Sequence, residues 1–315
     1  MLGFEEIVGH KEQIDFLQQA LKMGKLSHSY IFEGISGIGK KAIALAFAKI
    51  ILNNEGSFDS GNHPDFMLIE PDGRSIKNEQ IEQFQEFVSI KPYRGDSKVI
   101  LIDDASTMTV SAQNRILKTL EEAPKNVVII FVCETVSALL PTIVSRCQTL
   151  SFSRLDNHLI ADYLKNVHEL SEEEASVYSQ FGDGSLKKAV DAVVSEDFKE
   201  ARANTIKLLM ALHKGERANV ITWVDVLLKL ELPTADVFDL METCYRDLML
   251  LLVFGLPERV MNKDYMDELN VCGQMLQRKK LIKYIEAIES AKKMLKENVN
   301  EAIAFDGLVI TLQEG

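Results

Sequence analysis

The sequence contains few cysteines and no cysteine pair with the spacing of a metal or redox motif. Its four cysteines, Cys133, Cys147, Cys244 and Cys272, are scattered, and no two of them form a C-x-x-C pair. This distribution indicates neither a zinc site nor a disulfide framework, and it is typical of proteins from a reducing compartment. We therefore expect a cytoplasmic protein without structural disulfides.

The chain also lacks a hydrophobic run long enough to cross a membrane. Its apolar run at residues 248–254 is far shorter than the roughly 20 residues that a helical span requires. The first six residues, MLGFEE, are acidic and do not form a secretory signal. We expect no membrane association.

The chain also has fewer basic than acidic residues. The 35 lysines and arginines are outnumbered by 47 aspartates and glutamates, which gives a net charge of −12. This balance argues against a broadly basic nucleic-acid-binding surface on the isolated chain, although it allows a small basic patch or contact through partners. The basic clusters at residues 278–280 and 292–293 are interpreted as solvated helix faces.

What the chain does contain is an alternation of short apolar runs and amphipathic helical segments in its first half. A length of 315 residues predicts two or three domains. Strands that alternate with helices predict a parallel sheet covered on both faces, and the region after about residue 153 shows helical patterns only. We expect an α/β domain at 1–153, a small helical domain at 154–208 and a second helical domain at 209–315. The predicted strands are residues 29–32, 66–69, 99–102, 127–132 and 149–152, and the predicted helices before residue 153 include 10–24, 41–49, a segment around 76–88 and 114–122.

The segment Gly34–Lys41, GISGIGKK, joins the first predicted strand to the second predicted helix. Its glycines Gly34, Gly37 and Gly39 allow backbone N–H groups to turn toward an anion, and the helix N-terminus adds partial positive charge. Lys40 stands where an ammonium reaches the terminal phosphates of a nucleotide. The next position normally holds the Ser or Thr that binds Mg²⁺, but here it is Lys41. The segment is thus a phosphate-binding loop that lacks its metal-binding hydroxyl; the alternative is a glycine-rich turn that caps a helix.

An acidic pair follows the buried strand predicted at 99–102. Asp103 occupies the place of a carboxylate that holds Mg²⁺ through water, and Asp104 occupies the place where a glutamate usually orients the attacking water. Aspartate is one methylene shorter than glutamate, and a misplacement of about 1 Å can cost roughly 10²-fold in rate. The alternative is that the two acids only cap a strand and solvate a turn.

Together these segments resemble the clamp-loader branch of the AAA+ proteins, and in particular the bacterial DNA polymerase III clamp loader. The resemblance covers most of residues 1–190, and the last hundred residues are only generically similar to the family's collar domain. It implies an AAA+ P-loop domain, a helical lid and an all-α collar. The segments that carry it are FEEIVGH at 4–10, LSHSYIF at 26–32, the loop, GNHPD at 61–65, IKP at 90–92, IDDA at 102–105, AQNRILKTLEEAP at 112–124 and LPTIVSRC at 140–147.

The resemblance gives Arg146 of the Ser-Arg-Cys segment a role as an arginine finger, which reaches into the nucleotide site of the adjacent subunit. It also implies partners: the other clamp-loader subunits, the sliding clamp, and primer-template DNA mainly through the complex. Without the motif, Arg146 would be interpreted as a surface arginine near a helix end.

The sequence departs from the family's motor subunits at four places. Lys41 replaces the Mg²⁺-binding hydroxyl, and Asp104 replaces a glutamate. Cys133 and Glu134 stand where motor subunits carry the threonines of the first sensor, and Lys187 replaces the arginine of the second. These changes predict a site with little or no ATPase activity that binds ATP or ADP weakly and without metal, and the resemblance then implies a stator subunit. The alternative is an active ATPase motor that tolerates them.

A fifth departure concerns zinc. Many relatives carry a four-cysteine zinc module between the loop helix and the next strand, but here residues 53–62 contain no cysteine. His63 alone cannot supply a tetrahedral ligand set. We therefore expect no zinc.

Overall fold

The computed structural model describes residues 3–53, 58, 63–122, 124–297 and 299–314. The chain divides into two compact units, one formed by Met1–Ala175 with Gly182–Ala189 and the other by Ser176–Phe181 with Val190–Gly315. Each unit is described by itself. No helix within the described ranges is long and apolar enough to cross a membrane.

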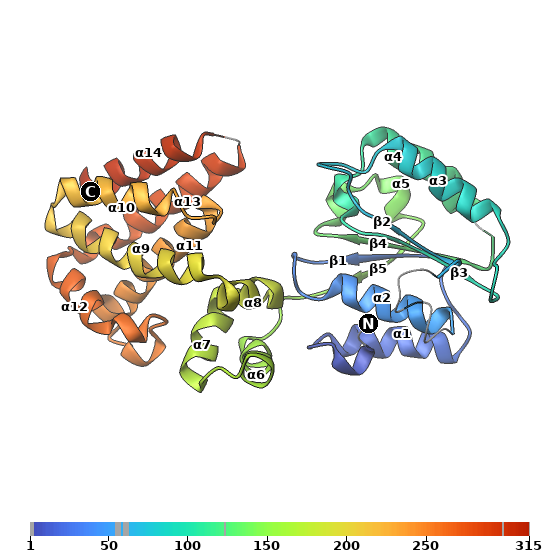
Figure 1. The fold of residues 1–315 in the computed structure, drawn as a ribbon, viewed down its shortest axis with the longest axis horizontal. Coiled ribbons are helices and arrows are strands. Elements are labelled where there is room, and N and C mark those ends of the chain that lie inside the picture. Colours follow the sequence, from blue (N-terminus) through green and yellow to red (C-terminus); the bar gives the residue numbers. More distant parts are fainter. Residues whose placement is uncertain (1–2, 54–57, 59–62, 123, 298, 315) are drawn as a thin grey trace. The chain divides into compact units, whose positions relative to one another are not determined.

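The N-terminal unit is built on a five-stranded parallel sheet with the strand order β2-β3-β4-β1-β5. Helices α1 and α2 cover one face of the sheet, and α3, α4 and α5 cover the other (Figure 1). The strands are β1 (Ser29–Glu33), β2 (Phe66–Ile69), β3 (Lys98–Ile102), β4 (Val127–Cys133) and β5 (Gln148–Ser151). The helices are α1 (Lys11–Lys22), α2 (Lys40–Ile51), α3 (Asn78–Ser89), α4 (Val110–Glu121), α5 (Pro141–Val144) and α6 (Asn157–His168).

The continuous apolar run of β4 follows from burial of both sheet faces. Val128 and Ile130 pack in the cluster beneath α1 and α2, whereas Ile129 and Phe131 pack in the cluster beneath α3 and α4. Because successive side chains point to opposite faces, a strand covered on both sides needs apolar residues at every position. The expected doubly covered parallel sheet is confirmed.

Hydrogen bonds explain why helices α3 and α4 begin at other residues than predicted. Helix α4 begins at Val110, four residues before its predicted start, because the Thr109 hydroxyl accepts a hydrogen bond from the backbone N–H of Ala112 and caps the helix. Ile76 lies outside α3 and instead forms a parallel bridge with Met108. Both differences depend on hydrogen bonds that apolar periodicity does not report.

The described residues of the C-terminal unit form helices joined by turns and short connections, with no strand among them. Its helices are α9 (Glu196–Lys214), α10 (Arg217–Leu227), α11 (Thr234–Met249), α12 (Met266–Met275), α13 (Leu281–Lys296) and α14 (Glu301–Glu314), with a π-helical segment η4 (Leu250–Phe254) after α11. Helices α7 (Glu172–Phe181) and α8 (Leu186–Val194) each contribute residues to both units. The predicted boundary between residues 208 and 209 falls inside α9.

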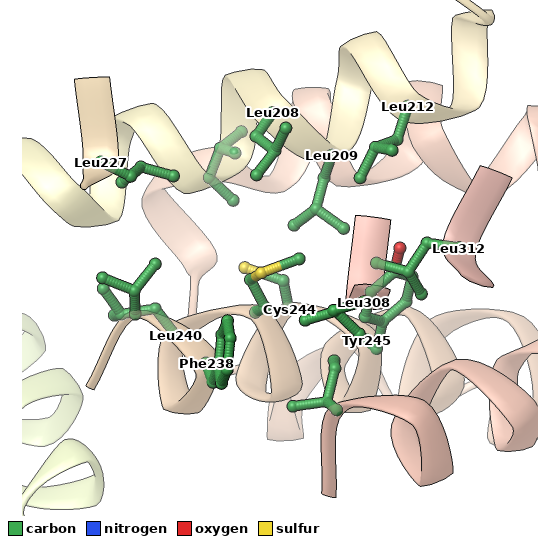
Figure 2. Close-up of a cluster of buried hydrophobic side chains, with 14 of the residues drawn as sticks. Leu208, Leu209, Leu212, Leu227, Phe238, Leu240, Cys244, Tyr245, Leu308 and Leu312 are labelled. Carbon is green, nitrogen blue, oxygen red and sulfur yellow. The ribbon is translucent and has the colours of Figure 1, made fainter. Parts of the chain in front are cut away.

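The C-terminal core forms where α9, α10, α11 and α14 face one another (Figure 2). Leu209 and Leu212 of α9 and Leu308 and Leu312 of α14 lie close to Tyr245 of α11, and Phe238 lies seven residues earlier on the same helix. Phe238 and Tyr245 are fully buried. This single apolar cluster holds the helices of the unit together.

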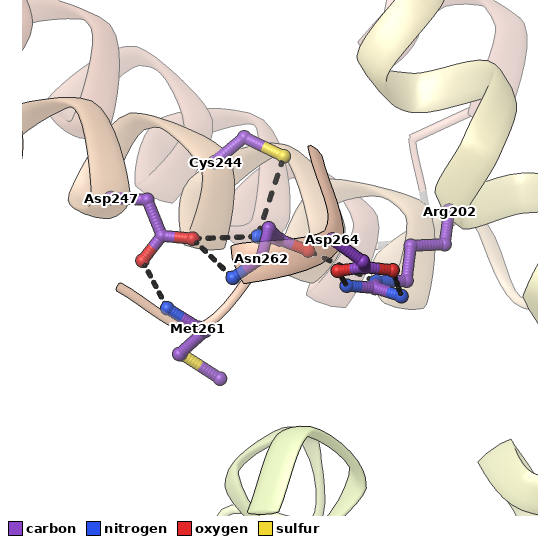
Figure 3. Close-up of polar contacts among 6 residues, drawn as sticks. All are labelled: Arg202, Cys244, Asp247, Met261, Asn262 and Asp264. Carbon is purple, nitrogen blue, oxygen red and sulfur yellow. Dashed lines mark hydrogen bonds and ion pairs between the residues drawn. The ribbon is translucent and has the colours of Figure 1, made fainter. Parts of the chain in front are cut away.

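A polar network fixes the segment between α11 and α12 (Figure 3). The buried carboxylate of Asp247 accepts hydrogen bonds from the backbone N–H groups of Met261 and Asn262, each at 2.9 Å, and from the Asn262 amide at 2.7 Å. The Arg202 guanidinium of α9 donates to Asn262 Oδ1 and makes a two-pronged ion pair with Asp264 at 2.7 and 2.5 Å. The network thus ties α9, α11 and the following segment into one unit.

Candidate functional site

The glycine-rich loop lies at the carboxyl end of β1 and leads directly into α2. Gly37 and Gly39 have φ angles of +76° and +105°, a conformation that glycine adopts without steric cost. Lys40 is the first residue of α2. The strand, turn and helix predicted from the sequence are therefore present around the loop.

Lys40 is buried beneath this loop, with a relative exposure of 6%. Its Nζ atom donates hydrogen bonds to the carbonyl oxygens of Gly34 at 2.5 Å and Ile35 at 2.6 Å. Burial lowers the pKa of Lys40, while the negative charge of Glu134 and other nearby acids opposes that shift. The ammonium thus sits inside the turn where the motif places it.

Lys41 forms ion pairs with two acids at the carboxyl edge of the sheet. Its Nζ atom lies 2.8 Å from Asp103 Oδ2 and also pairs with Glu70 Oε1. Burial alone would lower the pKa of Lys41, but the hydrogen bonds to Asp103 and Glu70 outweigh it and raise the pKa. The predicted metal-side carboxylate is therefore already paired with a cation of the chain itself.

Asp104 follows in a left-handed conformation with φ +48°. Partial desolvation, and then the negative charges of Asp103 and Glu134, raise the pKa of Asp104. Its backbone N–H donates to Asp103 Oδ1 at 3.1 Å. The site therefore contains the acidic pair that the sequence predicts, with the shorter aspartate in the second position.

The first-sensor position lies at the end of β4, beside β1. Cys133 is the last residue of β4 and aligns with Glu33 in the parallel register. Burial raises the pKa of Cys133 to about 11, so its thiol stays protonated at neutral pH. Glu134 follows it on the exposed side. Neither side chain carries a hydroxyl group.

Lys187 contacts the glycine loop through its backbone N–H group. Its N–H donates to the carbonyl oxygen of Gly37 at 3.0 Å. A Cβ atom on Gly37 would lie 2.3 Å from Ser185 Oγ and 2.8 Å from Lys187 Cβ. Gly37 is therefore needed for a close approach as well as for a turn, because no side chain fits between the loop and the start of α8.

Arg146 lies apart from these residues, at the amino end of the sheet. It follows α5 and precedes β5, and its carbonyl oxygen accepts a 2.8 Å hydrogen bond from the Ser29 hydroxyl at the start of β1. The guanidinium, 35% exposed, pairs with Glu121 Oε1 at 2.6 Å and donates to the Thr142 carbonyl oxygen at 2.8 Å. The loop, by contrast, follows the other end of β1.

Three residues that contact the predicted site residues had no individual role predicted from the sequence. Glu70 follows β2 directly, so the rule that selected Asp103 at the same sheet edge could have found it. Glu121 pairs with Arg146 across 25 residues of sequence. His10, whose ring Nε2 lies 2.8 Å from the Ile38 carbonyl oxygen, contacts the loop across 28 residues. No local pattern links the last two to their partners.

Metal ligands are not gathered anywhere in the part of the chain that the structure describes: no group of three or more His, Cys, Asp and Glu side chains could hold an ion there. The interval predicted to lack a zinc module, residues 53–62, lies mostly outside the described residues. His63 is described; it is buried, and its Nδ1 accepts the backbone N–H of Asp65. The absence of zinc stays a prediction.

The sheet order, the glycine loop between β1 and α2, and the acidic pair after β3 are those of an α/β P-loop fold of the AAA+ type. A DNA polymerase III gamma-subunit-related protein from Thermotoga maritima shares this fold, with 16% identity, a TM-score of 0.50, and coverage of 95% of this chain and 98% of that chain.

The sequence comparisons identify the family within this class. Residues 9–156 match the family described as "DNA polymerase III, delta subunit". The DNA polymerase III subunit delta' of Bacillus subtilis is 33% identical, with 95% of this chain and 94% of that protein covered. The tau subunit of the same organism is 26% identical, and the alignment spans 98% of this chain but 61% of tau. The chain belongs to the DNA polymerase III delta' family, and its role is that of a clamp-loader component in DNA replication.

Proposed function

We propose that this chain is the stator of a clamp loader. In this role it gives Arg146 to the ATP site of an adjacent subunit and helps load the sliding clamp onto primed DNA. It has little or no ATPase activity of its own. Membership of the delta' family supports the clamp-loader role, and the geometry of the site supports the division of labour between subunits.

The observation that carries this proposal is the position of Arg146 at the amino end of β1. A strand rises about 3.3 Å per residue, so the five residues of β1 separate the Ser29–Arg146 contact from the loop by about 16 Å. The guanidinium therefore cannot serve its own loop, although it is partly exposed to solvent. A planar guanidinium offered in trans stabilises the charge that develops on a transferred phosphoryl group.

The chain's own loop lacks the means to hold catalytic magnesium. Magnesium requires oxygen ligands in a near-octahedral arrangement, but the hydroxyl position is Lys41 and the Asp103 carboxylate is paired with Lys41. Asp104 is too short for the usual water-orienting role. These features do not fit a magnesium-dependent ATPase site.

A stator role also implies particular ligands and partners for this chain. The buried Lys40 and the backbone donors of the loop support weak binding of ATP or ADP without hydrolysis. The helices α9 to α14 form the collar that contacts other clamp-loader subunits, and the sliding clamp and primer-template DNA are reached mainly through the assembled complex. The net charge of −12 agrees with DNA contact through the complex rather than through a broad basic surface.

The test replaces Arg146 with alanine in a loader reconstituted with its partner subunits. Loss of an arginine finger costs on the order of 10³-fold or more in hydrolysis at the site that it serves. We expect clamp-dependent ATP turnover and clamp loading to fall, with the complex still assembled. Arg115→Ala is the matched control, because Arg115 is also partly exposed and ion-paired, to Glu82. A loader indifferent to Arg146→Ala would refute the role in trans.

A second measurement addresses the absent ATPase activity. Turnover by the purified chain is measured with Mg²⁺ and ATP, and we expect none above background. Substantial magnesium-dependent turnover would instead support a motor subunit.

A further inference from the structure

Lys41 occupies the position from which a P-loop usually presents a hydroxyl to a metal ion. It is the second residue of α2, and its ammonium reaches across to Asp103 after β3 and Glu70 after β2. The two strands are neighbours in the sheet, with Ile69 aligned to Ile102. The carboxyl edge of the sheet therefore supplies two negative charges to one ammonium of the chain.

This arrangement neutralises charges that a divalent ion would otherwise use. Asp103 is 20% exposed and lies 2.8 Å from the Lys41 ammonium, so it cannot also bind a metal without breaking that ion pair. A fixed positive charge also repels a divalent cation placed beside it. The hydrogen bonds that raise the pKa of Lys41 keep it charged at neutral pH.

We infer that Lys41, held by Glu70 and Asp103, replaces the metal of this loop and determines its ligand specificity. The loop then takes the phosphate chain of a nucleotide as the free polyanion rather than as its magnesium complex. The phosphate chain meets the Lys40 ammonium and the N-terminus of α2, while Lys41 offsets the negative charges of Asp103 and Glu70 that would otherwise repel it. The inference rests on the proposed weak nucleotide site and names the form of the ligand and the residue that selects it.

The experiment measures ADP binding to the purified full chain by calorimetry, once with excess EDTA and once with excess Mg²⁺. For the natural chain we expect binding in EDTA that is weaker in Mg²⁺, because magnesium removes free ADP from solution. Lys41→Thr restores the hydroxyl and frees Asp103, and we expect Mg²⁺ to tighten its ADP binding by about tenfold or more. Lys77→Thr is the matched control, since Lys77 also pairs with an acid, Asp72, and should keep the natural pattern.

Lys41→Met separates the effect of losing the ammonium from the effect of gaining a hydroxyl. It removes the ammonium without adding a metal ligand, so we expect weaker ADP binding in EDTA and no gain from Mg²⁺. This variant also provides a test if Lys41→Thr does not fold. Tighter binding of magnesium ADP by the natural chain would overturn the inference, as would no ADP binding in either buffer at millimolar concentration. Neither outcome bears on Arg146, whose role is decided by the reconstituted loader.

Discussion

Replacing Asp247 with alanine tests how far one buried carboxylate holds the C-terminal unit together. Asp247 is fully buried on α11 and accepts hydrogen bonds from two backbone N–H groups and from the Asn262 side chain. Through Asn262 the contact continues to Arg202 on α9. Alanine removes all three acceptor contacts at once, which takes the partner from the two backbone donors and leaves the Asn262 amide only its 3.9 Å contact with Cys244 Sγ.

The expected loss follows from the donors left behind. A buried polar group stripped of its partner costs about 1–3 kcal/mol. Three such donors set an upper range that partial relaxation and water entry reduce, so we expect a loss of about 3–5 kcal/mol in the free energy of unfolding. Because a single domain is commonly stable by only about 5–15 kcal/mol, Asp247→Ala should leave this unit marginally stable.

The assay uses the single tryptophan of the sequence. Trp223 lies on α10 and packs against the C-terminal core, so its fluorescence reports urea unfolding of that unit. Asp225→Ala is the control. Asp225 is exposed on α10, the helix that carries Trp223, and substitutions of exposed residues usually change the free energy of unfolding by about 0.5 kcal/mol or less. A loss below about 1 kcal/mol in the free energy of unfolding of Asp247→Ala would refute the reasoning, because it would show that the network does not stabilise the unit.

Two further predictions concern a titrating group and a close backbone approach. Burial, and then the charge of Lys280, lower the pKa of His213 from 6.5 to about 4, so between these values the unfolded chain binds a proton that the folded chain does not. The free energy of unfolding should therefore fall by up to about 3 kcal/mol as the pH drops from 6.5 to 4. Urea unfolding of His213→Gln, measured between pH 6.5 and 4, should lack most of this fall in the free energy of unfolding. An unchanged pH dependence would contradict the attribution of the fall to His213. Gly37→Ala would place a Cβ atom 2.3 Å from Ser185 Oγ and should speed hydrogen exchange at the Lys187 amide, which donates to the Gly37 carbonyl. Gly95→Ala is the control and should leave that amide unchanged, because its Cβ atom meets only Ser97 N, at 4.0 Å.

The sequence by itself determined the α/β class of the first half and most of its elements. Strands buried on both faces have continuous apolar runs, as in β4 and in β3 after Lys98, and such runs can be recognised in the sequence. The glycine loop could be predicted in the same way, because its glycines and Lys40 lie within one short segment and its conformation depends on local sequence. Asp103 could be placed beside the loop because parallel strands end at a common edge.

Only the tertiary structure decided what these residues contact. The pairing of Lys41 with Glu70, and of Arg146 with Glu121, joins residues 29 and 25 positions apart, and no periodicity in the chain encodes either contact. The same holds for the opposite ends of β1, where Ser29 fixes Arg146 at one end and the loop follows the other. A motif specifies its residues by local spacing, but their electrostatic partners and distances depend on how strands and helices pack. For this reason the sequence predicted a loop with one unusual lysine, and the fold showed that the lysine is paired with the carboxylate a metal would need.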